Sequence, residues 1–62
     1  MAKMIYSENN NMMIPQGFTW HEQTWKWNEM DEVYYNVEDE EDGVYSLDSA
    51  LKRIALGQFK AL

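Results

Sequence analysis

The acidic residues of this chain have the number and spacing most suggestive of chemistry, and they cluster in two stretches. The clustered carboxylates are Glu29, Asp31 and Glu32, followed by the unbroken run Glu38, Asp39, Glu40, Glu41 and Asp42. Charge runs are commonly solvated loops, and they can also form an anionic surface that docks on a basic groove. Because alternate connections of a β-meander emerge at opposite ends, we expect the two stretches at different edges of the sheet.

The unbroken run also partly matches the spacing of a calcium-binding loop. Glu38, Glu40, Asp42 and Gly43 fall at loop positions one, three, five and six. The match then fails, because the first ligand is Glu rather than the more compact Asp and position twelve is Ser49 rather than a bidentate Glu. The sequence therefore predicts no specific calcium site, no other metal and no cofactor.

Catalytic chemistry has little support in the residue types present. His21 is the single histidine and the chain has 0 cysteines, so a zinc site lacks its usual ligands. Ser46 and Ser49 could be drawn into a Ser/His/Asp arrangement, but helix capping already explains both serines. No nucleophile-elbow, phosphate-loop or zinc-protease motif is present. The sequence predicts a protein that is not an enzyme.

Aromatic residues make up 15% of the chain, more than one helix can cover on one face of a small sheet. Large aromatic side chains dominate small cores, so most of them are expected inside. The remainder, expected to include Tyr34 and one tryptophan, would lie exposed on the second face. Tryptophan and tyrosine commonly anchor protein interfaces. The aromatic partner-binding candidates are Trp20, Trp25, Trp27 and Tyr34.

Alternation of aromatic and β-branched residues predicts antiparallel strands in the middle of the chain. Residues 18–27 are expected to form a hairpin connected by residues 21–24, with its aromatic side chains at strand spacing. A strand is predicted over 33–37, after the polar connection 28–32, and a short returning strand at 44–45 follows the acidic turn.

The C-terminal part of the chain predicts one helix. Ser46 is a good N-cap, and Gly57 fits the left-handed position that ends many helices. Residues 58–62 would then be a tail, or a continuation of the helix. The buried stripe expected at helical spacing is Leu47, Ala50, Leu51, Ile54 and Ala55.

The N-terminal part is ambiguous between a flexible segment and an edge strand over residues 1–14, with a turn at 15–17. Together these elements predict a single α+β domain over residues 1–62. Its architecture is expected to be a small antiparallel meander of three to five strands with one C-terminal helix packed on one face.

Length and charge exclude several classes of protein. The chain has 62 residues, with Lys+Arg 5 and Asp+Glu 11, so its formal net charge is −6. That charge repels nucleic-acid phosphates and anionic lipid head groups, so we expect neither direct nucleic-acid binding nor a membrane partner. No apolar run approaches the roughly 20 residues that span a bilayer. The absence of cysteine suits a reducing cytoplasm.

These features predict a small acidic, non-catalytic protein-binding module. The expected partner is another protein with a basic surface, such as the groove of a nucleic-acid-handling enzyme, which the carboxylates would block by imitating phosphates. In general style the composition is similar to that of small inhibitor proteins that bacteriophages direct against host enzymes, although no motif is shared. The alternative is a structural or assembly protein that forms a homodimer or serves as an accessory subunit.

Overall fold

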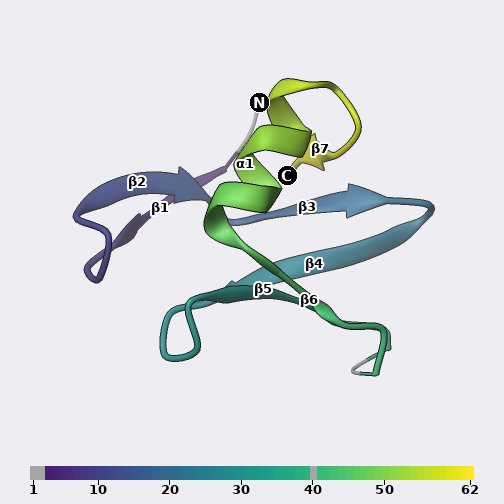
Figure 1. The fold of residues 1–62 in the computed structure, drawn as a ribbon, viewed down its shortest axis with the longest axis horizontal. Coiled ribbons are helices and arrows are strands. Elements are labelled where there is room, and N and C mark those ends of the chain that lie inside the picture. Colours follow the sequence, from purple (N-terminus) through teal and green to yellow (C-terminus); the bar gives the residue numbers. More distant parts are fainter. Residues whose placement is uncertain (1–2, 40) are drawn as a thin grey trace.

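The computed structural model describes residues 3–39 and 41–62 and contains one helix and seven strands (Figure 1). The elements in chain order are β1 (Met4–Ser7), β2 (Met12–Pro15), β3 (Gly17–Trp20), β4 (Gln23–Asn28), β5 (Val33–Asn36), β6 (Val44–Ser46), α1 (Leu47–Ala55) and β7 (Lys60–Ala61). The α+β class is confirmed, and so is the single C-terminal helix. The strands number seven, in two antiparallel sheets, rather than three to five.

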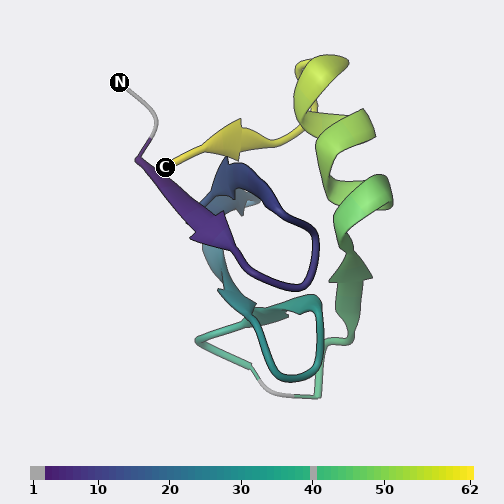
Figure 2. The same ribbon diagram turned by 90° about the vertical axis from the view of Figure 1, so that its left-hand side faces the viewer.

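The larger sheet has five strands in the order β6-β5-β4-β3-β7, and every pairing in it is antiparallel. Its register places Phe18 opposite Trp25, and Tyr34 between Trp27 and Tyr45. Because side chains alternate between the faces of a sheet, these rings share one face. The helix covers that face (Figure 2).

The core is an aromatic cluster between the sheet and the helix. Phe18 is at its centre: its ring stacks on Phe59 at 4.3 Å and on Trp25 at 5.4 Å between centroids. Such aromatic pairs contribute about 0.5–1.5 kcal/mol beyond the area they bury. The buried members are Phe18, Trp25, Tyr34, Ala50 and Phe59, with Trp20, Trp27, Tyr45, Leu47 and Ile54 packed against them.

The helix begins and ends as its sequence predicts. The side chain of Ser46 accepts a hydrogen bond from the Ser49 N–H at 3.3 Å, and Gly57 has a φ of +82°. A left-handed residue at this position stops the helix at low cost only when it is glycine. Of the expected buried stripe, Ala50 is buried, Leu47, Leu51 and Ile54 are half-buried, and Ala55 is exposed.

The segment after the helix is neither a tail nor more helix. It turns back across the core, where Phe59 is 2% exposed, and then pairs as β7 with β3. The Leu62 N–H donates to the Gly17 carbonyl at 3.0 Å and continues that ladder. The burial of one phenyl ring therefore gives the last residues of the chain a fixed place in the sheet.

The N-terminal segment forms its own hairpin, β1–β2, so the edge-strand alternative holds for its described part. Gln16 alone separates β2 from β3, and it joins the sheets: its N–H donates to the Lys3 carbonyl at 2.8 Å and its carbonyl accepts from the Trp27 N–H at 3.0 Å. The Lys3 N–H in turn donates to the Leu62 carbonyl. Thus β7 and β1 lie end to end beside β3 and β2, and Lys3 meets Leu62 (Figure 2).

Two expected turns are placed differently in the structure. Residues 15–17 do not form a turn, because Gly17 already pairs with Lys26; an added Cβ there would lie 2.2 Å from the Trp25 carbonyl oxygen. The β3–β4 connection is two residues rather than four. Both of them, His21 and Glu22, have positive φ (50° and 64°), as the tight hairpin turn that matches strand twist requires.

Candidate functional site

The aromatic candidates for partner binding belong to the core. Trp25 is 1% exposed and Tyr34 0%, while Trp20 and Trp27 are half-buried and pack against the same cluster. The expectation that Tyr34 is exposed is wrong. The register of β5 between β4 and β6 puts Tyr34 on the helix-covered face and turns its neighbour Tyr35 outward.

Tyr34 also has a specific internal partner. Its hydroxyl donates to the Pro15 carbonyl at 2.8 Å, a buried bond that ties the end of β2 to β5. Burial raises the pKa of Tyr34 to about 12, because the phenolate would lose its hydration. The ring is thus a structural link between the two sheets.

Glu29 is likewise engaged within the protein. One carboxylate oxygen accepts from the Trp27 indole N–H at 2.7 Å, and the other accepts from the Asn9 N–H at 2.9 Å and the Ser7 hydroxyl at 3.2 Å. These bonds, with that from Trp27 first, hold the pKa of Glu29 below its ordinary value of 4.5. Glu29 joins the β4–β5 connection to the turn of the β1–β2 hairpin.

The long acidic run is organised by a buried amide. The Asn36 side chain, 0% exposed, accepts from the Glu38 and Asp39 N–H groups at 2.8 and 3.1 Å. It donates to Gln23 at 3.1 Å and to the Asp42 carboxylate at 3.2 Å. Glu38 accepts from the Thr24 N–H at 2.8 Å, and Glu40 lies outside the described residues.

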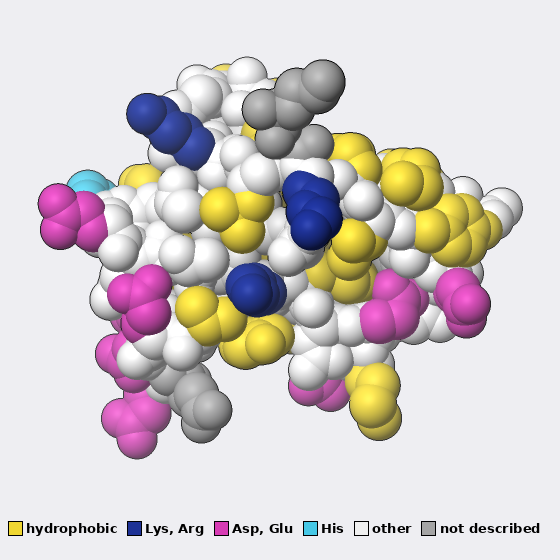
Figure 3. Space-filling view, turned by 180° about the vertical axis from the view of Figure 1, so that it is seen from behind, with side chains coloured by type: hydrophobic (Ala, Val, Ile, Leu, Met, Phe, Trp, Pro, Cys, Tyr) yellow, Lys and Arg dark blue, Asp and Glu magenta, His cyan; other side chains and the backbone are white. Residues whose placement is uncertain are grey.

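The connections that carry the clustered carboxylates lie at opposite ends of the sheet, as expected for a meander (Figure 1). The acidic end comprises the β3–β4 turn and the β5–β6 connection, with Glu22, Glu38, Asp39, Glu41 and Asp42. The hairpin end comprises the β1–β2 turn and the β4–β5 connection, with Glu8, Glu29, Asp31 and Glu32. Seen from behind, acidic side chains lie toward both ends and Lys and Arg side chains lie between them (Figure 3).

The hydrogen bonds of these carboxylates leave their charge uncompensated. Every donor to Glu29, Asp31, Glu38, Asp39 and Asp42 in the described chain is a hydroxyl, an amide or an indole N–H. An uncharged donor orients a carboxylate and stabilises its charged form without cancelling its field. The two ends therefore remain anionic.

An apolar surface on the N-terminal hairpin lies outside the candidates predicted from the sequence. Met4, Tyr6 and Met13 are 44%, 54% and 51% exposed, and the register puts Tyr6 opposite Met13. We call these three residues the hairpin face. The signal for it was available, since Met4 and Tyr6 are two residues apart in a segment with strand character.

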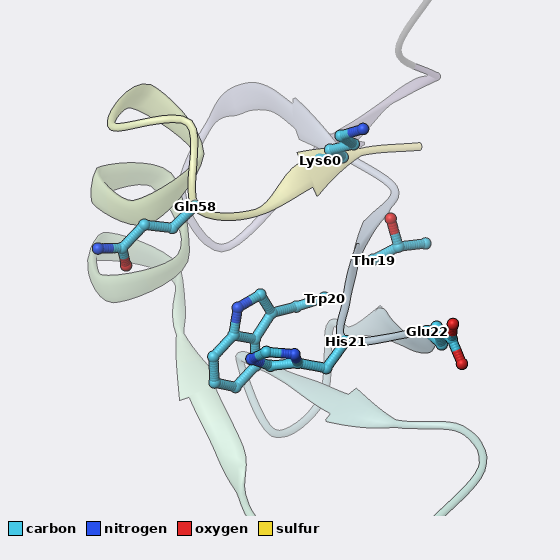
Figure 4. A pocket seen from close by; sticks show the side chains of 6 residues that line it. All are labelled: Thr19, Trp20, His21, Glu22, Gln58 and Lys60. Atoms are coloured by element: carbon cyan, nitrogen blue, oxygen red, sulfur yellow. The ribbon is translucent and has the colours of Figure 1, made fainter.

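A shallow hollow of about 280 Å³ lies beside the single histidine (Figure 4). The Trp20 and His21 rings are close together there, with centroids 4.2 Å apart, whereas Glu22, Gln58 and Lys60 lie apart from one another. Within residues 3–39 and 41–62, no group of three or more His, Cys, Asp or Glu side chains is arranged to hold a metal ion.

The one helix among the described residues is too short to cross a bilayer. No protein-family model, curated protein or solved structure matches this chain.

Proposed function

We propose that this protein is a small, acidic, non-catalytic binding module that docks on a basic surface of another protein. The observation that carries the proposal is the placement of its carboxylates: they lie at both ends of a small sheet, and Glu29, Glu38 and Asp42 among them are oriented by uncharged donors that leave them anionic. Ordered anionic groups steer a basic partner into an encounter and accelerate association.

The partner we favour is a nucleic-acid-handling enzyme. Carboxylates held at the two ends of a rigid protein present separated negative charges, as phosphates do along a nucleic-acid strand, and can occupy the same basic groove. Binding would inhibit the enzyme by excluding its substrate. The net charge of −6 argues against contact with nucleic acid itself, and the lack of cysteine fits a reducing, cytoplasmic setting.

Competition for a captured partner tests this proposal. The tagged full chain is used to capture its partner from the native cell, and short duplex DNA is then added at low and at high ionic strength. We expect the DNA and the protein to exclude each other, and the affinity for the partner to fall as salt rises. A partner retained equally at both ionic strengths, and indifferent to DNA, would contradict the proposal.

The contribution of each end is separated by two matched variants. Glu22→Gln/Asp39→Asn/Glu41→Gln changes the acidic end, and Glu8→Gln/Asp31→Asn/Glu32→Gln changes the hairpin end. Each removes three of the 11 acidic charges and takes the net charge from −6 to −3. Both are expected to slow association, because steering depends on the whole field.

A second candidate function, assembly through self-association, is favoured by one observation: the hairpin face is an exposed apolar surface. Two copies would bury it against each other, and the same chain could then serve as an accessory subunit. Light scattering at two concentrations distinguishes the functions, since a dimer that persists to low micromolar concentration supports assembly.

A further inference from the structure

The hairpin face is an apolar surface without a covering element among the described residues. Its three side chains project from the two strands of β1–β2, on the side opposite Ile5 and Ile14. Ile14 is 0% exposed, so one side of the hairpin packs on the protein while the other meets solvent. Viewed from behind, hydrophobic side chains gather over the hairpin (Figure 3). Contiguous exposed apolar surface with a polar rim marks interaction sites.

This hairpin is held as a rigid platform. Glu29 bonds the Ser7 hydroxyl and the Asn9 N–H, and the Asn9 side chain donates to the Glu29 carbonyl at 3.0 Å. Tyr34 fixes the other end through the Pro15 carbonyl. The Tyr6 hydroxyl donates to Asn11 Oδ1, which orients that ring. Binding to a pre-ordered surface loses less conformational entropy than binding to a flexible segment.

The charges around the hairpin face indicate the chemistry of its partner. Glu8 follows β1 directly, and the bonds between Asn9 and Glu29 bring Asp31 and Glu32 alongside the hairpin turn. Met30, in the same connection, is 93% exposed. The surface is therefore apolar, with carboxylates beside its turn and the exposed Lys3 next to Met4 at its other end. Its complement is an apolar surface bordered by lysine or arginine.

A second exposed apolar pair lies on the larger sheet. Tyr35 and Val44 lie opposite each other on the outer face of the larger sheet and are 37% and 57% exposed. Lys26 pairs with Tyr35 on its other side, so a cation borders this pair. The two pairs are alike in size and exposure, and they differ in place: one lies on the hairpin, and the other adjoins the acidic connection that precedes Val44.

We propose that the hairpin face docks an amphipathic segment of a partner protein whose apolar side is flanked by lysine or arginine. The inference rests on the proposed binding function and names its contact surface. Methionine side chains adapt to varied apolar shapes, which suits them to such a contact. A second copy of the chain is disfavoured as the occupant, because two molecules of charge −6 would bring like carboxylate borders together.

The probe for this contact is a short synthetic amphipathic helix of leucine and lysine, titrated into the full-length protein and followed by NMR. Polylysine and a leucine–glutamate helix serve as comparison ligands. The test variant is Tyr6→Ser/Met13→Ser. The matched control is Tyr35→Ser/Val44→Ser, which removes an equivalent cross-strand pair from the larger sheet. Both variants change exposed side chains, and thermal unfolding verifies that each remains folded.

We expect the leucine–lysine helix to shift the methyl signals of Met4 and Met13, and the test variant to weaken its binding at least about tenfold with the control unchanged. Equal loss in both variants, or equal binding of polylysine, overturns the hairpin contact while leaving the acidic binding function in place. If the two net-charge −3 variants also associate with the captured partner protein as fast as the wild type does, the proposed function fails as well. Dimerisation through the hairpin face, seen as methyl shifts on dilution without ligand, overturns the choice of occupant.

Discussion

At the two ends of the sheet, different kinds of side chain accept the hydrogen bonds of the nearby N–H and O–H groups. At each end a fully buried polar residue lies beneath an acidic connection: Ser7 at the hairpin end and Asn36 at the acidic end, both 0% exposed. At the hairpin end the acceptor for the neighbouring N–H and O–H groups is a carboxylate, Glu29. At the acidic end a neutral amide accepts the two loop N–H groups instead.

This difference shows that a carboxylate's role depends on the donors around it. Glu29 gathers three donors from β1, the hairpin turn and β4, and its charge stabilises the fold. In the acidic run over residues 38–42, Asn36 bonds two N–H groups and the Asp42 carboxylate, while Asp39 and Glu41 are exposed and available to a partner. Acidic residues that look alike in the sequence therefore have different roles: Glu29 stabilises the fold, whereas Asp39 and Glu41 contribute surface charge.

The largest effect should come from Asn36→Ala. It leaves two loop N–H groups and the Gln23 side chain without a partner, and we expect a loss of about 2–3 kcal/mol in the free energy of unfolding. Urea unfolding measures it. The matched variant at the other end is Asn28→Ala, whose half-buried side chain accepts from the Met30 and Asp31 N–H groups. It should cost about 1 kcal/mol, and equal costs would refute the special role of Asn36.

Tyr34→Phe should have the next largest effect. It removes the bond between the two sheets and leaves the Pro15 carbonyl unpaired, for an expected loss of about 1–2 kcal/mol. Because the folded pKa of about 12 lies above the ordinary value of 10.0, the wild type keeps this stability below pH 10 and loses it as the pH rises toward 12. The Phe variant lacks that alkaline loss. Tyr35→Phe, at an exposed position, is the control in both measurements.

Glu29→Gln should lower the free energy of unfolding by less than Tyr34→Phe does, and the size of the loss should depend on pH. The pKa of Glu29 is lowered on folding, so its contribution is present above pH 4.5 and is lost as the pH falls through the folded pKa. The gap between wild type and variant should therefore close in acid. Chemical unfolding at several pH values measures the gap, with Glu32→Gln as the control; a gap that is constant with pH would show that the charge of Glu29 is not used.

The smallest effects should be gains from relieving backbone strain, one at each end. Glu22 and Glu32 have φ values of 64° and 54°, in the left-handed region that favours glycine. Glu22→Gly and Glu32→Gly should each raise the unfolding free energy by about 0.5–1 kcal/mol. Thermal unfolding at moderate salt detects both. Similar gains would confirm that the ends differ in their side chains and not in their backbone, whereas a loss at one end would reveal a side-chain contact there.

The sequence was informative wherever the relevant signal was local. The helix could be predicted because capping and the apolar stripe act within a few residues, as Ser46 and Gly57 show. The acidic connections were predicted for the same reason, since polar runs cannot continue a buried strand. The strand count was short partly because β7 is two residues long and carries no pattern of its own; it exists because Phe59 enters the core. The N-terminal segment, which was ambiguous in the sequence, adds β1 and β2.

The candidate site was predicted less well. The carboxylates were correctly located at opposite ends, but Tyr34 and Trp25 were assigned to a partner although they fill the core. Period-two alternation shows which side chains share a face and does not show which face the helix will cover. The hairpin face was overlooked because its exposure depends on where β1–β2 packs.

What the sequence by itself determined was local conformation and net charge: where the helix caps, which segments extend, and that acid outnumbers base. Only the tertiary structure decided which face of the strands is inside, that Glu29 is an internal acceptor, and that Lys3 meets Leu62. The reason is physical. Capping, turn and strand preferences act between neighbours along the chain, whereas burial and the pairing of a donor with its acceptor depend on residues brought together by packing.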